Sequence, residues 1–147
     1  MKFANKDKSL TLSVVAYEFP EENGKGEDFS YDANWLVLHG EYAEKGSVRS
    51  FDNSCLLTTE LQSISAALKL IIANVQDSYQ SEFIEPYFEL TIEALDATRF
   101  MVYASFAMLV SEDKWQNFGV ESIMSISELK ALSEDVEQAV KAFPVKD

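Results

Sequence analysis

The chain has 147 residues, of which 47% are apolar and 12% are aromatic. This length and composition predict one folded domain over residues 1–147 and exclude a disordered chain. The 25 acidic and 12 basic residues give a formal net charge of −13. That charge disfavours nucleic acids and anionic membranes as partners, because binding phosphates requires clustered Lys and Arg. It predicts instead a basic protein partner, although acidity also serves solubility alone.

The ends and the cysteine content predict a location. No run of about 18 apolar residues is present, so a membrane-spanning helix is not expected. Residues 1–8 lack the apolar stretch of a secretion signal. The single cysteine, Cys55, cannot form an internal disulfide. We therefore expect a cytoplasmic protein.

The first third of the chain shows three strand patterns. Apolar residues alternate with polar ones from Ser9 to Phe19, and residues 21–31 form a polar loop. A second strand is predicted over Asn34–Tyr42, with Trp35 as a large buried anchor. A third follows over Ser47–Phe51.

An amphipathic helix is predicted next. Its apolar stripe recurs at steps of three and four residues, at Leu61, Ile64, Leu68, Ile71 and Val75. Thr59 and Gln62 have the spacing of a capping box. We therefore expect a helix over residues 59–76.

Three further strands are predicted after the helix. Residues 88–94 alternate between apolar and polar side chains, which is typical of a strand covered on one face. Arg99–Leu109 is apolar on both faces, which predicts a central strand. The last strand is predicted over Gly119–Ile126.

A second amphipathic helix closes the chain. Ser125 and Glu128 have capping-box spacing, and Pro144 ends the pattern. The element order βββαβββα predicts an α+β fold. We expect one antiparallel sheet of about six strands, with both helices packed on one of its faces.

The residues that catalysis or metal binding would need are scarce. The chain has one histidine, His39, and one cysteine, so a metal site of the His and Cys type lacks ligands. The sequence contains no phosphate-binding loop, dinucleotide fingerprint or nucleophile elbow. Cys55 precedes two leucines, which favours a buried, inert thiol over a reactive one. We therefore expect no enzyme, metal or cofactor.

Acidic residues form two candidate clusters. Glu85, Glu89 and Glu93 share parity on one predicted strand, so their side chains would line its polar face. A solvated face, a docking face for Lys and Arg, and a carboxylate pair for hydrolysis are the three interpretations, in that order. The loop from Glu18 to Asp32 carries the second cluster, which includes Glu21, Glu22, Glu27 and Asp28. It fits either a solvated loop or electrostatic steering of a partner.

Several short motifs carry a resemblance to a known family. They are Tyr31-Asp32-Ala33-Asn34-Trp35-Leu36, then Asp52-Asn53-Ser54-Cys55-Leu56-Leu57-Thr58-Thr59-Glu60-Leu61, then Phe83-Ile84-Glu85-Pro86, and finally Ala142-Phe143-Pro144. In this order and spacing, from about Ser9 to Pro144, the chain resembles the WapI-like family of bacterial immunity proteins. Asn53-Ser54 stands where members of the family often have a proline.

The resemblance implies a cytoplasmic antitoxin that binds the toxic C-terminal domain of a contact-dependent or wall-associated toxin. For the named family, that domain is a nuclease acting on transfer RNA. The motif residues resemble fold determinants, so they imply no binding site; Asp32 and Asn34 are expected to hold the backbone at the start of their strand. An adaptor or regulatory subunit with another partner, or a carboxylate-based hydrolase, are the alternatives.

Overall fold

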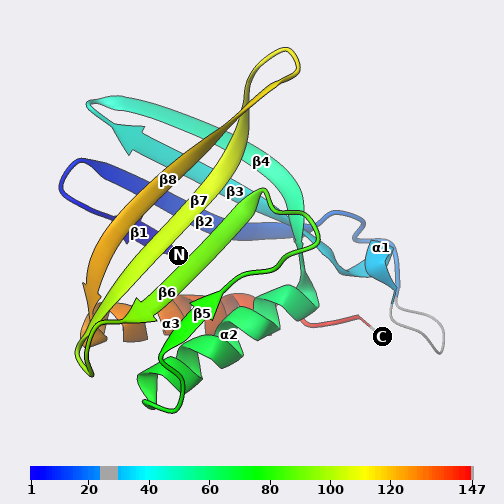
Figure 1. Cartoon of the computed structure of the whole chain (residues 1–147). Helices are drawn as coiled ribbons and strands as arrows, with labels where there is room; N and C mark the ends of the chain where they lie inside the picture. Colours follow the sequence, from blue (N-terminus) through cyan, green and yellow to red (C-terminus); the bar gives the residue numbers. More distant parts are fainter. Residues whose placement is uncertain (24–29, 147) are drawn as a thin grey trace.

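The computed structural model describes residues 1–23 and 30–146, and its fold is α+β, as predicted (Figure 1). The elements in chain order are β1 (Lys2–Ala4), β2 (Lys8–Tyr17), α1 (Tyr31–Asn34), β3 (Trp35–Glu44), β4 (Ser47–Leu57), α2 (Thr58–Ile72), β5 (Ser78–Gln80), β6 (Phe88–Ala94), β7 (Arg99–Ser111), β8 (Lys114–Ser125) and α3 (Ile126–Ala142).

The strands form two antiparallel sheets, so the predicted single sheet of about six strands is wrong. The first sheet has the order β1-β2-β3-β4 and the second has the order β5-β6-β7-β8. Each strand pairs with its neighbour in the chain, and α2 separates the two runs of strands. The sequence patterns missed β1 and β5 because three residues are too few to show an alternation.

Two predicted strands are also longer in the structure. β4 continues to Leu57 and β8 begins at Lys114, because both pair along long neighbours, β3 and β7. The prediction that Arg99–Leu109 is central is confirmed, since β7 lies between β6 and β8. Its residues Ala104 to Met108 are all buried.

The two sheets pack face to face around a shared core. Gly40 in β3 lies directly opposite Phe106 in β7: a Cβ atom on Gly40 would lie 2.4 Å from the Phe106 ring. Phe106 is fully buried, as are Leu12 and Leu38 of the first sheet. The missing side chain at Gly40 therefore makes room for an aromatic ring between the sheets.

The helices α2 and α3 lie side by side across one end of the paired sheets, at the bottom of the view in Figure 1. α2 contacts β4 of the first sheet, whereas α3 contacts β7 and β8 of the second. Their apolar stripes join the core between the sheets, at Leu61, Ile64, Leu68, Leu129, Leu132 and Val136. The prediction that both helices cover one face of a single sheet is therefore corrected.

The helix starts were predicted with mixed success. In α3 the capping box is confirmed: Glu128 N donates to Ser125 Oγ at 3.2 Å, and Ser125 N donates to Glu128 Oε1 at 3.1 Å. The predicted box of Thr59 and Gln62 is wrong, because α2 begins one residue earlier, at Thr58.

The side chain of Glu60 caps the start of α2. Its Oε1 accepts from Leu57 N at 2.9 Å, and its Oε2 accepts from Ile84 N at 2.9 Å. One carboxylate thus holds the helix start and ties the segment before β6 to it.

The end of α2 also differs from the prediction. The helix stops at Ile72, and Asn74 adopts a left-handed backbone with φ of 60°. Val75, predicted to belong to the apolar stripe, is 74% exposed. Asn tolerates the left-handed conformation better than most residues and so ends the helix there.

Asn34 binds the nearby backbone as predicted, but Trp35 is not the large buried anchor that the sequence predicts. Leu36 and Leu38 point into the core, so Trp35, one position earlier in β3, is only half-buried. Asn34 is fully buried instead. Its Oδ1 accepts from Thr58 Oγ1 at 2.7 Å and from Lys146 N at 2.8 Å. Its Nδ2 donates to the carbonyls of Ser30 and Lys146, both at 2.8 Å.

Candidate functional site

The predicted acidic strand face is present in part. Glu89 and Glu93 are exposed on β6, where they alternate with buried Phe88, Leu90 and Ile92. Glu85 lies before β6 in the segment that leads into it and is half-buried, so it does not continue the row. The prediction was wrong for Glu85 because residues an even number of positions apart share a face only within a regular strand, and Glu85 precedes β6.

The register of the second sheet adds residues that sequence reasoning missed. Thr91 of β6 lies opposite Tyr103 of β7, which in turn lies opposite Glu121 of β8. Tyr103 and Glu121 are both exposed and therefore share the outer face with Glu89. Only strand pairing brings these residues together, because they come from three separate stretches of the chain.

The second predicted acidic cluster is described in part. Glu21 and Glu22 are exposed. The C-terminal segment holds their loop, because Lys146 Nζ donates to the carbonyls of Pro20 at 3.3 Å and Glu22 at 3.1 Å. Glu27 and Asp28 lie outside the described residues. The structure therefore fixes the base of this loop close to the C-terminal segment.

His39 lies between two carboxylates on the outer face of the first sheet. Its Nδ1 is 2.5 Å from Asp52 Oδ1, and its Nε2 is 3.3 Å from Glu41 Oε1. Hydrogen bonding to Asp52, and then to Glu41, raises the pKa of His39 above its ordinary value of about 6.5. Both ring nitrogens face acceptors, so the imidazolium is the form that fits the site.

We expect an NMR titration of the native protein to give a His39 pKa above about 6.5, and the Asp52→Asn variant to give a lower value. The signal is unambiguous because the chain has one histidine. Glu41→Gln is the matched comparison and should lower the pKa less, since its contact is longer. The stabilisation by the imidazolium is complete below about pH 6.5 and is lost as the pH rises through the native pKa. An unchanged pKa in Asp52→Asn would contradict this assignment.

Ser, His and Asp, the residue types of a hydrolytic triad, lie on three neighbouring strands of this face. Ser13 of β2 lies opposite His39 of β3, which lies opposite Asp52 of β4. The Nε2 of His39 contacts Glu41, however, and Ser13 forms no hydrogen bond with it. The nucleophile-to-base contact that acyl transfer uses is therefore not formed here.

The prediction of a buried Cys55 is confirmed. Its side chain is fully buried, and burial raises its pKa to about 12. The negative charges of Glu60 and Glu85 contribute to this raised pKa, after burial. The thiol stays protonated at neutral pH, which makes it a poor nucleophile.

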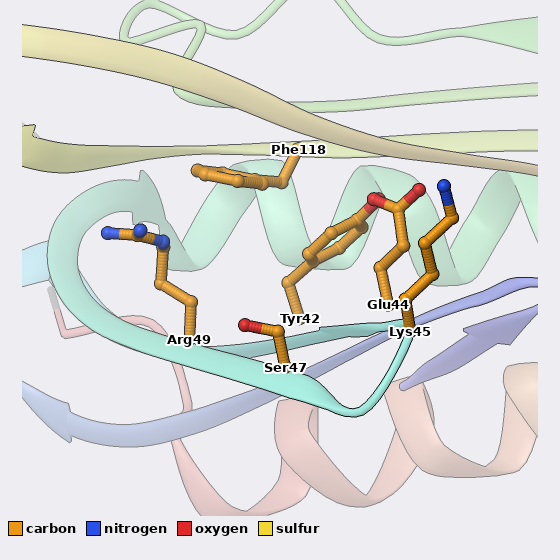
Figure 2. Close-up of a pocket in the computed structure, with 6 residues that line it drawn as sticks. All are labelled: Tyr42, Glu44, Lys45, Ser47, Arg49 and Phe118. Carbon is orange, nitrogen blue, oxygen red and sulfur yellow. The ribbon is translucent and has the colours of Figure 1, made fainter.

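A hollow of about 420 Å³ opens between the β3–β4 hairpin and β8 (Figure 2). Figure 2 shows the rings of Tyr42 and Phe118 facing each other, with Arg49 on one side and Glu44 and Lys45 on the other. The two ring centroids are 5.0 Å apart, and the Arg49 guanidinium lies 5.6 Å from the Phe118 ring. Ser47 completes the lining. The sequence could not reveal this hollow, because its residues meet only through the strand register and the packing of the two sheets.

The chemistry of the hollow is that of a polar cleft with aromatic walls. The Tyr42 hydroxyl donates to Glu44 Oε2 at 2.9 Å. Burial, followed by this hydrogen bond, raises the pKa of Tyr42 to about 12, so the phenol remains a donor. Glu44 is the one carboxylate in the lining, so the hollow does not supply the carboxylate pair of a glycosidase.

Two further properties of the described residues bear on function. Over residues 1–23 and 30–146, no three His, Cys, Asp or Glu side chains gather in a metal-binding arrangement. Within the same ranges, no helix has both the length and the apolar content needed to cross a bilayer.

No curated protein and no solved structure matches the chain. The model of the immunity protein WapI-like family matches residues 2–144, which is nearly the whole chain. This match confirms the resemblance that the short motifs indicated. The chain therefore belongs to the WapI-like family of immunity proteins.

Proposed function

We propose that this protein is an antitoxin that binds the toxic C-terminal domain of a cognate toxin in the cytoplasm and neutralises it. The observation that carries the proposal is the family match over residues 2–144. His39 bonds Asp52 and Glu41 and not the Ser13 hydroxyl, and the Cys55 thiol is protonated; both observations support a binding role over catalysis. The protein acts, on this view, as a rigid surface and not as a reagent.

The proposed mechanism combines electrostatic attraction with steric blocking. The family resemblance suggests that the toxin is a nuclease acting on transfer RNA, and a surface that holds RNA phosphates must be basic. A partner with a net charge of −13 is attracted to such a surface and can cover it. The acidic residues proposed for contact are Glu21, Glu22, Glu27, Asp28, Glu85, Glu89 and Glu93.

The proposal predicts salt-dependent association. We expect the rate of binding to the toxin domain to fall at least about tenfold between 50 and 500 mM NaCl, because salt shortens the screening length severalfold over this range. Stopped-flow mixing measures this rate directly. A rate that stays constant across the series would remove the electrostatic part of the mechanism and leave steric blocking.

Co-expression tests the function itself. The toxin domain to use is the C-terminal region of the reading frame directly upstream of this gene, produced in a host that it kills. Co-expression of this chain should restore growth, and the two proteins should co-purify. A host that dies despite a soluble, folded chain would overturn the proposal. If no toxin-like frame adjoins the gene and the chain co-purifies with a different host protein, the adaptor alternative would be supported instead.

A further inference from the structure

The outer face of the second sheet is open at Tyr103 of β7, whereas Ser105 and Ala107, further along the same side of the strand, are buried. Figure 1 shows β6, β7 and β8 in front, with no helix lying across them in the part of the chain that the structure describes. The strand register places three rows of residues on this side. We call nine of them the open face: Ser78, Gln80, Glu89, Thr91, Glu93, Met101, Tyr103, Glu121 and Ile123. The row of Glu89 also contains Ser105, which is buried, and Gly119. Sheets of this kind usually present polar side chains to water on an uncovered side.

The open face departs from that expectation at its centre. Ile123 is 55% exposed and Tyr103 is 37% exposed, and they stand on neighbouring strands with Met101 beside them. Apolar and aromatic side chains grouped on an uncovered sheet are typical of a contact surface. Scattered single apolar residues would need no such explanation.

The ring of Tyr103 lies against a glycine on the next strand. A Cβ atom on Gly119 would lie 2.6 Å from the Tyr103 hydroxyl oxygen and 3.0 Å from its ring. The ring therefore lies across β8 at the one position that has no side chain to block it. A Tyr side chain has only two rotatable bonds, so it loses little conformational entropy when a partner binds.

Negative charge surrounds this apolar centre. Glu89, Glu93 and Glu121 are exposed, and none of them forms an ion pair with any residue in the described ranges. None of the nine positions is Lys or Arg. Arg99, which precedes Met101 on the same side of β7, is already bound by Asp96, with Nη2 to Oδ2 at 2.9 Å. The face thus presents uncompensated carboxylates around an apolar spot.

We propose that the open face is the surface on which the toxin domain docks. Tyr103 and Ile123 would pack on an apolar spot of that domain, and Glu89, Glu93 and Glu121 would pair with the Lys and Arg side chains around it. This assignment rests on the proposed function above. Charge complementarity favours this face over the hollow of Figure 2, because Lys45 and Arg49 line the hollow and would repel a basic partner.

Two charge-reversal variants of equal net charge test the surface. The face variant is Glu89→Lys with Glu121→Lys. The control is Glu112→Lys with Glu134→Lys, which lie in the turn between β7 and β8 and on α3, are exposed and make no side-chain hydrogen bond in the described residues. Each substitution adds two charge units, so both variants change the formal charge from −13 to −9. Circular dichroism and urea midpoints verify that both fold, and calorimetry measures the Kd for the co-expressed toxin domain.

We expect the face variant to raise Kd at least about a hundredfold and to lose protection in the growth assay, with less than about a fivefold change for the control. Tyr103→Ala should weaken binding at least about tenfold without altering charge. If both reversal variants weaken binding equally, or Tyr103→Ala has no effect, the open face is not the docking surface, while the antitoxin function stands. If the unaltered chain itself neither binds nor protects, the antitoxin function fails and the docking proposal fails with it.

Discussion

Replacing Phe106 with Ala should lower the free energy of unfolding by about 4 kcal/mol, which is the largest loss that we expect from any single substitution in this chain. Phe106 is fully buried between the two sheets, directly above Gly40. Removing the ring leaves a cavity that neither sheet can close, because each is held by its own strand pairing. Urea unfolding followed by tryptophan fluorescence measures the loss.

Phe19→Ala is the matched control. Phe19 is 44% exposed, so the same substitution there should cost less than about 1 kcal/mol. A Phe106→Ala variant as stable as Phe19→Ala would contradict the packing of the two sheets described above.

The contact between Gly40 and Phe106 also predicts that the losses in free energy of unfolding from substitutions at the two positions do not add. Gly40→Ala places a methyl group against the Phe106 ring and should destabilise the native chain by about 1–3 kcal/mol through overpacking. In the Phe106→Leu background, the side chain is shorter, so the same Gly40→Ala substitution should cost less. If Gly40→Ala costs the same free energy of unfolding in both backgrounds of this double-mutant cycle, the two positions do not touch.

Replacing Asn34 with Ala should cost about 3 kcal/mol, the second largest loss that we expect. The substitution removes four hydrogen bonds that join α1, the start of α2 and the C-terminal segment. It also leaves the hydroxyl of Thr58, which is 1% exposed, without its partner. Urea unfolding again supplies the measurement.

Two further variants separate hydrogen bonding from volume at this position. Asn34→Asp keeps the shape but turns an oxygen toward the carbonyls of Ser30 and Lys146, so we expect a loss of similar size. Asn53→Ala is the control, because the Nδ2 of Asn53 has no hydrogen-bond partner among the residues that the structure describes. It should cost less than about 1 kcal/mol. Equal losses at Asn34 and Asn53 would refute the role assigned to Asn34.

Sequence patterns predicted an element correctly when the contacts that stabilise it lie within a few residues of the chain. The capping box of Ser125 and Glu128 is formed within one helical turn, so its spacing alone identified the start of α3. The alternation in residues 88–94 and the doubly apolar pattern of β7 reflect which faces are buried, and both strands were found. Burial of Cys55 was predicted correctly from its apolar neighbours.

Errors arose where a distant residue decided the local structure. Thr59 and Gln62 had capping-box spacing, but Glu60 caps the start of α2 through Leu57 N and also binds the distant Ile84 N. Trp35 was the largest apolar residue of its motif, yet Asn34 is the buried one, because Thr58 and Lys146 satisfy its polar atoms. Neither partner is recognisable from the motif itself.

The residues of the candidate contact surfaces likewise follow in part from local sequence patterns and in part from contacts between distant residues. The acidic surplus follows from composition. The two-residue period of a strand predicts that Glu89 and Glu93 lie on the same face of β6. The addition of Tyr103 and Glu121, the exclusion of Glu85, and the hollow between the sheets depend on strand register and sheet packing.

Composition, local period and short motifs were enough to predict the α+β class, the acidic character of the chain and its family. The division of the strands into two facing sheets, and the grouping of acidic and aromatic side chains on one surface, became known from the three-dimensional fold. Strand pairing and sheet packing join residues far apart in the chain, so the free energy of those contacts has no signature in any short stretch of sequence.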